Sequence, residues 1–215
     1  MTMPIGITAP HDGLTRESTF LLLVDYQVGP LWEPDAVQLR RDVVALARVA
    51  SSLGVPTALT AMSCDDWGPI ISELIHVTPS AAVIQRSVLD PWSVPRVRQA
   101  IEATGRTHLV IAGVATELCV DHAALGATRD GYTVHVVLDA SGHFSAIAAA
   151  AAVLRMRAGG VIVSNCATVL LELVNGDLQR RASELLAVSL RHKLPRPPLA
   201  VGVPRRHSTV KPGHP

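Results

Sequence analysis

Short apolar runs of strand length alternate along this chain with longer segments of helical periodicity, and this alternation constrains the fold more than any other feature. The first run, Phe20 to Val24, is continuously apolar, which is typical of a strand buried on both faces. Alternating strands and helices produce a parallel sheet covered by helices on both sides. We therefore predict an α/β fold with three layers, αβα, around a central, mainly parallel sheet of about six strands.

Turn and helix-end signals set the bounds of these elements; Gly54 and Pro56, for example, end the first helix. The predicted strands span residues 20–24, 55–62, 82–84, 107–112, 132–138 and 161–164. The predicted helices span residues 35–53, 95–104, 117–130 and 145–158, with a helical turn around 70–75 and a last helix over 167–174.

The length of 215 residues and the apolar content of 48% allow one sizeable core and leave little for a second domain. We expect an N-terminal extension over residues 1–18, a single domain over 19–192 and a C-terminal tail over 193–215. The tail is rich in Pro and Gly and has no hydrophobic periodicity. It is either a solvated segment or an arm that lies on a neighbouring subunit.

The formal net charge is only +1, so the charge balance does not require nucleic acid or an anionic membrane as a partner. Basic residues are concentrated at the C-terminus, where residues 177–215 hold eight Lys or Arg against two Asp or Glu. No aromatic residue is interleaved with them for base stacking. We therefore expect no nucleic acid and no membrane as a partner.

The three cysteines, Cys64, Cys119 and Cys166, are an odd number and form no CxxC pair, which argues against a disulfide framework and a cysteine-rich zinc site. The first eighteen residues lack the charged start and long apolar centre of a signal peptide. No apolar segment reaches membrane-spanning length. These features predict a soluble protein of the reducing cytoplasm.

Polar or reactive residues follow four of the predicted strands. They are Asp25, Arg86, Cys119 and Asp139. Because open parallel sheets bind ligands outside the carboxyl ends of their strands, these side chains are expected to gather at one edge of the sheet. For each carboxylate alone, the simpler interpretation is a hydrogen bond to a loop or a helix end.

The neighbourhood of Cys119, Gly113-Val-Ala-Thr-Glu-Leu-Cys-Val, predicts a helix start with Thr116 as its N-cap. Cys119 would then lie in the first turn, where unpaired N–H groups and the helix dipole favour a thiolate over a thiol. Such a position activates a nucleophile and supplies donors for an oxyanion. The alternative is a small buried residue, since free cysteine is among the most buried residue types.

Three segments carry a family resemblance: LLLVDYQ, the stretch from Arg86 to Trp92, and LVIAGVATELCVDHAAL followed by GYTVHVVLDASG. From about Thr19 to Val174 the chain resembles the isochorismatase-like cysteine hydrolase superfamily, with a pattern similar to its YcaC-like hydrolases. The resemblance implies a Rossmann-like fold. It also implies a homo-oligomer, because relatives commonly form dimers, tetramers or larger rings.

The resemblance assigns Asp25 as general base, Cys119 as nucleophile and Arg86 to a position that usually holds lysine. Arginine stays charged and offers a planar fork, so Arg86 should position groups and stabilise charge rather than move a proton. The family pattern also implies a cis peptide bond just before Ala115. This bond would turn the N–H groups of Ala115 and Cys119 toward one point as an oxyanion hole.

Nicotinamidases of this superfamily carry an Asp, His and His zinc site after the second strand, whereas this chain reads Ser-Cys-Asp-Asp-Trp-Gly from Ser63. Cys64, Asp65 and Asp66 could imitate such a site, but the paired histidines are missing. We expect no metal and no cofactor, and nicotinamide is disfavoured as substrate. Isochorismatases replace the cysteine, so the presence of Cys119 argues against their vinyl-ether hydrolysis.

Aromatic and polar residues near the predicted strand ends are candidates for the substrate pocket. We predict that substrate contacts Tyr26, Gln27, Trp92, His143 and Phe144. The alternative for the aromatic residues is core packing. His143 replaces a small polar residue common among relatives, so it either tunes substrate choice or is an exposed loop histidine.

Residues and resemblance together predict a cysteine hydrolase, an amidohydrolase, that cleaves an amide or related C–N bond of a small-molecule substrate through a thioester. Two other classes stay open. One is a small-molecule binding or oligomeric assembly protein with a vestigial triad. The other is a lyase or isomerase that uses Asp25 without the thiol. The sequence names no substrate.

Overall fold

The computed structural model describes residues 13–31 and 36–174. Its six strands form one parallel sheet in the order β3-β2-β1-β4-β5-β6, which confirms the predicted sheet. The strands are β1 (Thr19–Val24), β2 (Thr57–Met62), β3 (Ala82–Arg86), β4 (His108–Gly113), β5 (Thr133–Val137) and β6 (Ile162–Ser164). The helices are α1 (Ala36–Ser52), α2 (Ser72–Val77), α3 (Pro95–Glu102), α4 (Asp121–Arg129), α5 (Ala146–Ala158) and α6 (Cys166–Val174). Shorter helical segments are η1 (Asp65–Trp67), η2 (Pro91–Ser93), η3 (Thr116–Val120) and η4 (Leu138–Ala140).

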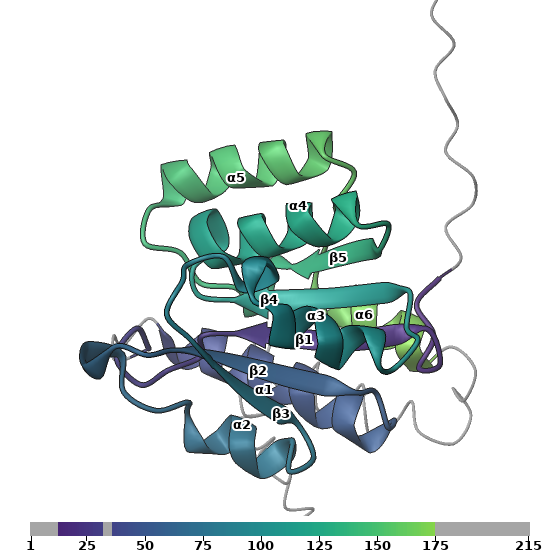
Figure 1. The fold of residues 1–215 in the computed structure, drawn as a ribbon, viewed down its shortest axis with the longest axis horizontal. Coiled ribbons are helices and arrows are strands. Elements are labelled where there is room, and N and C mark those ends of the chain that lie inside the picture. The colour runs from purple at the N-terminus through teal and green to yellow at the C-terminus, as the bar shows by residue number, and fades with distance from the viewer. Residues whose placement is uncertain (1–12, 32–35, 175–215) are drawn as a thin grey trace, which may run out of the picture.

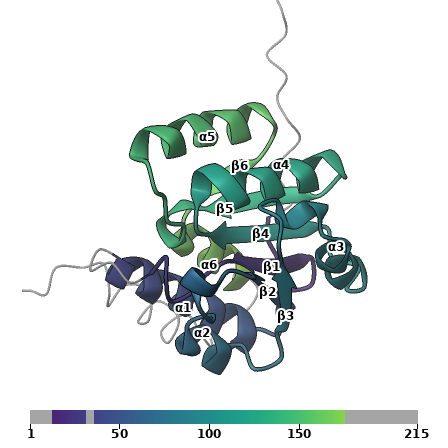
Figure 2. The same ribbon diagram turned by 60° about the vertical axis from the view of Figure 1, so that its left-hand side comes forward.

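Helices cover both faces of the sheet and complete the three predicted layers (Figure 1, Figure 2). The helices α1, α2 and α6 pack on one face, and α3, α4 and α5 pack on the other. The chain adds β2 and β3 on one side of β1 and then β4, β5 and β6 on the other. Open parallel sheets bind ligands where the strand order reverses in this way, which here is between β1 and β4.

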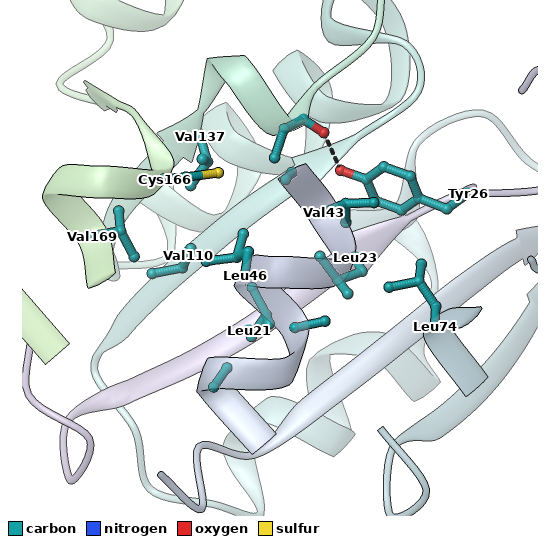
Figure 3. Close-up of a cluster of buried hydrophobic side chains, with 14 of the residues drawn as sticks. Leu21, Leu23, Tyr26, Val43, Leu46, Leu74, Val110, Val137, Cys166 and Val169 are labelled. Carbon is teal, nitrogen blue, oxygen red and sulfur yellow. Dashed lines mark hydrogen bonds between the residues drawn. The ribbon is translucent and has the colours of Figure 1, made fainter. Parts of the chain in front are cut away.

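Strand β1 shows how the sheet is buried on both sides. Successive side chains of a strand point to opposite faces. Leu21 and Leu23 lie in the core cluster of Figure 3, on the face that α1 covers. Phe20, Leu22 and Val24 lie in the opposite cluster, on the face of α3 and α4. All six residues of β1 are buried, as its continuous apolar sequence requires.

Two segments near the predicted site differ from expectation. The helix predicted over 117–130 begins as a π-helical turn, η3, in which the Val120 N–H donates to the Ala115 carbonyl at 3.3 Å, and α4 starts only at Asp121. Strand β3 runs two residues beyond its predicted end, so Arg86 is its last residue and pairs with Met62 of β2. The strand is longer than predicted because its last two residues, Gln85 and Arg86, pair with β2, although neither residue is apolar.

Parts of the predicted domain organisation lie outside the described residues: residues 1–12 of the extension, residues 175–192 of the domain and the whole tail. Residues 13–18 of the extension are described. Leu14 is buried in the core, and its N–H donates to Glu172 of α6 at 3.2 Å. No helix within 13–31 and 36–174 is long and apolar enough to cross a membrane.

Candidate active site

Three side chains meet at the carboxyl ends of the strands. Asp25 directly follows β1, Arg86 ends β3, and Cys119 lies in η3 after β4. Strand β3 is two places from β1 in the sheet, and the long side chain of Arg86 spans that gap. The side chains of Asp25 and Arg86 are fully buried, and Cys119 is 1% exposed. The three residues therefore form one buried cluster.

The guanidinium group of Arg86 joins the other two residues. Its Nη2 donates to the Asp25 carboxylate, forming an ion pair, and also donates to the Cys119 Sγ at 3.2 Å. Its Nη1 donates to the carbonyl oxygen of Val88 and to the sulfur of Met62, the latter at 2.9 Å. Because both ends of the planar fork are held, one nitrogen faces the carboxylate and the thiol together.

Asp25 receives further support from β2. The Thr60 hydroxyl donates to Asp25 Oδ1 at 3.0 Å, and the Asp25 N–H donates to the Thr60 carbonyl at 3.0 Å. The backbone of Asp25 has φ 58, and among the described residues it is the only non-glycine position with positive φ. Burial raises the pKa of the Asp25 carboxyl above its ordinary value, against the opposing charge of Arg86.

Burial, together with the charge of Asp25, raises the pKa of the Cys119 thiol from 9.0 to about 11, although Arg86 acts in the opposite direction. The resting side chain is therefore a thiol. The prediction that a helix start favours a thiolate here is wrong, because burial and the charge of Asp25 outweigh the effect of Arg86. Thr116 is also not the N-cap: Ala115 holds that position, and the Thr116 hydroxyl donates to the Gly142 carbonyl at 2.7 Å.

The peptide bond between Val114 and Ala115 is cis, as the family resemblance implied. Just before it, Gly113 passes very close to β1. A Cβ atom at Gly113 would lie 2.6 Å from the Val24 Cβ and 2.7 Å from the Val24 carbonyl oxygen, so only glycine fits. This close approach places the segment that leads to Cys119 against β1, the strand that Asp25 directly follows.

The residues predicted to contact substrate lie in different environments. Tyr26 is buried in the core cluster of Figure 3, where its hydroxyl donates to the Ala140 carbonyl. Gln27 is also buried; its amide accepts from the Met62 N–H and donates to the carbonyls of Met62 and Gly68. Both side chains make internal contacts that hold the chain around the end of β1.

Trp92 packs on α4 rather than standing free. Its indole N–H donates to Asp130 at 2.7 Å, and a Cβ at Gly126 would lie 2.6 Å from its ring. His143 and Phe144 are exposed in the loop before α5. Of the five predicted contact residues, these two present an open surface.

Glu117 has a role that the sequence analysis missed. One of its carboxylate oxygens accepts from the N–H groups of Phe144 and Ser145, each at 2.9 Å. Glu117 thereby ties the loop before α5 to the turn that carries Cys119. The sequence signal that could have indicated this role is Ser145, which is the N-cap of α5. Its hydroxyl accepts from the Ala148 N–H at 3.3 Å, and its own N–H is one of the two groups that Glu117 binds.

Asp139, the fourth strand-end residue, lies apart from the cluster, because its carboxylate accepts from the Cys166 N–H at 2.8 Å and joins the end of β5 to α6.

Cys64, a candidate member of an imitation metal site, is exposed. Within the described ranges, no three His, Cys, Asp or Glu side chains are grouped to hold a metal ion. A separate groove of about 350 Å³ is lined by Asp90, His122, Leu125, Arg129, Arg155 and Gly159, none of which belongs to the catalytic cluster.

Known proteins are similar to this chain in both sequence and fold. The isochorismatase domain model matches residues 19–168. The chain belongs to the isochorismatase family. Within that family, the "Probable hydrolase YcaC" of Escherichia coli (strain K12) is 37% identical over 148 residues, which cover 66% of this chain and 70% of that protein.

Two solved YcaC structures are similar to this isochorismatase-family chain over most of its length. YcaC from Pseudomonas aeruginosa, solved with hexane-2,5-diol and covalent acrylamide, is 33% identical with a TM-score of 0.80, covering 86% of this chain and 94% of its own. The Escherichia coli YcaC gene product, an octameric hydrolase of unknown specificity, is 34% identical with a TM-score of 0.79, covering 86% and 93%. The chain is thus a YcaC-type hydrolase of the isochorismatase family, which confirms the resemblance drawn from the sequence.

Proposed function

We propose that this chain is a cysteine hydrolase that cleaves an amide or related C–N bond of a small molecule through a thioester on Cys119. One observation carries the proposal: a single buried guanidinium nitrogen of Arg86 contacts both the Asp25 carboxylate and the Cys119 Sγ. This arrangement brings a base, a stabilising positive charge and a nucleophile together away from water.

The first step moves a proton. A thiol with a pKa of about 11 is a poor nucleophile at neutral pH, so it must give its proton to a base as it attacks. Asp25 is that base, and its raised pKa brings the carboxylate closer to the range in which it accepts a proton. Arg86 stays positive beside the pair while the negative charge moves from the carboxylate to the sulfur.

The sulfur then adds to the substrate carbonyl, and the C=O π electrons move onto oxygen. The N–H groups of Ala115 and Cys119 bind this oxyanion. Among the described residues the Ala115 N–H donates to no other backbone group, which supports this role. When the intermediate collapses, the C–N bond breaks and the amine leaves with the proton from Asp25. Water, deprotonated by Asp25, attacks the thioester, releases the acid and restores the thiol.

Mass spectrometry of the intact protein tests the proposal. After incubation with a library of small amides and carbamates and an acid quench, we expect an acyl adduct that peptide mapping locates on Cys119. Asp25→Asn should slow its formation by about 100-fold or more. Cys119→Ala should lose both adduct and turnover while it keeps the fold. Cys64→Ser is the matched control, because Cys64 is exposed and outside the cluster.

Two outcomes would overturn this mechanism. Turnover that survives in Cys119→Ala would favour a lyase or isomerase that uses Asp25 alone. Equal, slow labelling of all three cysteines by acrylamide, with no turnover of any amide, would favour a binding protein with a vestigial triad. Acrylamide is a suitable probe because it is bound covalently in the Pseudomonas aeruginosa YcaC structure.

We also propose that the chain works as a homo-oligomer in the cytoplasm. The octameric state of the Escherichia coli YcaC gene product supports the assembly. All three cysteines are free, which fits a reducing compartment. Sedimentation velocity of the full chain should show a species of more than one subunit.

A further inference from the structure

Helix α5 is apolar along most of its length and carries charge only in its last turn. Eleven of its thirteen residues are Ala, Ile, Val, Leu or Met, and the two others are Arg155 and Arg157 near its C-terminal end. A surface helix of a globular protein normally carries polar residues on its outer face, whereas a helix that is apolar all round is normally buried. The composition of α5 is therefore typical of a helix that packs against other protein on more than its core-facing side.

The described residues cover only one side of this helix. Ala152 and Met156 are its only buried residues. Figure 1 shows α5 as the outermost helix on its side of the sheet, beyond α4. Ile147 is 86% exposed and Leu154 is 67% exposed, which is unusual for two large aliphatic side chains on one helix.

These exposed residues share one face. Ile147, Ala150, Ala151 and Leu154 are spaced i, i+3, i+4 and i+7, and all four are exposed. We call this set the outer face of α5. It contains no charged residue. Arg155, at i+4 from Ala151, forms an ion pair with the buried Asp121 of α4, and Arg157, at i+3 from Leu154, flanks the C-terminal end of the strip. The outer face is therefore a continuous apolar strip.

We propose that the outer face of α5 binds the same face of a second copy of this chain. The inference rests on the homo-oligomer proposed above and adds the surface that forms it. Alanines in the middle of the strip allow two helices to approach closely. Two-fold symmetry places a patch against itself, and an antiparallel pair then keeps the Arg157 ends of the two helices apart. A charge-free strip is suited to such self-pairing.

The contact extends beyond the helix. A specific interface buries about 800 Å² on each partner, and a helix about 20 Å long and 10 Å wide supplies less than half of that. Phe144, which is 60% exposed, directly precedes α5. Its N–H is held by Glu117, two residues from Cys119. The subunit contact therefore reaches the loop that adjoins the catalytic turn.

Light scattering coupled to size-exclusion chromatography tests this surface on the full chain. We expect Ile147→Asp and Leu154→Asp to weaken assembly by at least tenfold each, and the double variant to elute as a smaller species. Ile75→Asp is the matched control, since Ile75 is 44% exposed on α2, far along the sheet from α5, and it should keep the wild-type mass.

The possible outcomes separate the proposals. A double variant that is folded by circular dichroism and keeps the wild-type mass overturns the α5 interface and leaves the oligomer standing; residues 175–215 of the same chain would then be the favoured cover. A monomeric wild type overturns both the assembly and the interface, while the thioester experiment decides the hydrolase separately.

Hydrogen–deuterium exchange on the wild type decides the case if the aspartate variants do not fold. The peptide over residues 146–158 should exchange more slowly at a high protein concentration, where the chain is assembled, than after dilution below the assembly range. Equal exchange in the two conditions, with a change in mass between them, overturns the proposal.

Discussion

Asp25 sets the acid side of the pH–activity profile. Only the ionised carboxylate accepts the proton of Cys119, and burial raises the pKa of this carboxyl above its ordinary value of 3.8. As the pH falls through the raised pKa, the base becomes protonated and kcat/KM falls. We therefore expect the acid limb of the profile to lie above pH 3.8. A kcat/KM profile with an amide substrate checks this, and a limb at or below that pH would contradict it.

Arg86 acts on both titrating groups. Its positive charge lowers the pKa of Asp25 and that of Cys119, against the effect of burial. In Arg86→Gln the acid limb should move to higher pH, and kcat/KM should fall by about 100-fold or more because the thiolate loses its counter-charge. Arg86→Lys keeps the charge and loses the planar fork, so its limb should stay in place. If the acid limbs of the kcat/KM profiles of the wild type and Arg86→Gln coincide, the charge of Arg86 does not lower the pKa of Asp25.

Among the elements, η3 and the loop before α5 are joined by Glu117. Glu117→Ala removes the acceptor for two backbone N–H groups, so we expect KM to rise severalfold with a smaller change in kcat. Glu117→Gln keeps one acceptor oxygen and should restore most of the wild-type KM. Steady-state kinetics of both variants give the answer. A loss confined to kcat would instead place Glu117 in the chemical step.

Trp92 and Phe144 test which aromatic side chains meet substrate. Trp92→Phe loses the hydrogen bond to Asp130 and part of the packing on Gly126, so it should lower the free energy of unfolding by about 1–2 kcal/mol and leave KM unchanged. Phe144→Ala, at a position that is exposed in the single subunit, should change the stability of the subunit by less than about 0.5 kcal/mol and raise KM. Urea unfolding and kinetics on both variants check this pair, and the reverse pattern would contradict it.

Stability of the whole molecule should depend on the Cys119 thiol at alkaline pH. Its pKa is 9.0 when the chain is unfolded and about 11 when it is folded, so the stabilisation is complete below 9 and is lost as the pH rises toward 11. Over that range the wild type should lose about 2–3 kcal/mol of unfolding free energy relative to Cys119→Ala. Urea unfolding of both proteins at a series of pH values measures the difference. Parallel curves would contradict the raised pKa.

The layers of the molecule could be predicted because they follow from strand order. Strand order also places Asp25, Arg86, Cys119 and Asp139 at one edge of the sheet, but only the family resemblance selected the first three, and Asp139 instead binds the Cys166 N–H. Continuous apolar runs such as β1 predict a sheet buried on both faces, and parallel strands end at one edge. These are properties of local pattern and topology. The layers do not depend on the detail of any side-chain contact, whereas the cluster depends on the Arg86 side chain, which reaches Asp25 and Cys119 from β3.

Other features depend on contacts between distant segments and could not be read from local pattern. Tyr26 directly follows Asp25, which suggested a place in the substrate pocket. Its ring is instead buried in the core, where its hydroxyl donates to the carbonyl of Ala140, 114 residues away. The Thr116 hydroxyl likewise binds Gly142 instead of capping a helix. The protonation of Cys119 results from burial by the assembled fold, which a helix-start pattern does not contain.

The backbone of Asp25 lies in the left-handed region, at φ 58. This conformation costs a residue with a Cβ atom about 1–2 kcal/mol and is the one that glycine adopts freely. Selection for folding alone would therefore favour glycine here, and selection for turnover keeps the carboxylate. In a lineage that has lost catalysis, we expect this position to drift early, together with Arg86, whose buried charge would otherwise have no counter-ion, while the apolar residues of β1 persist.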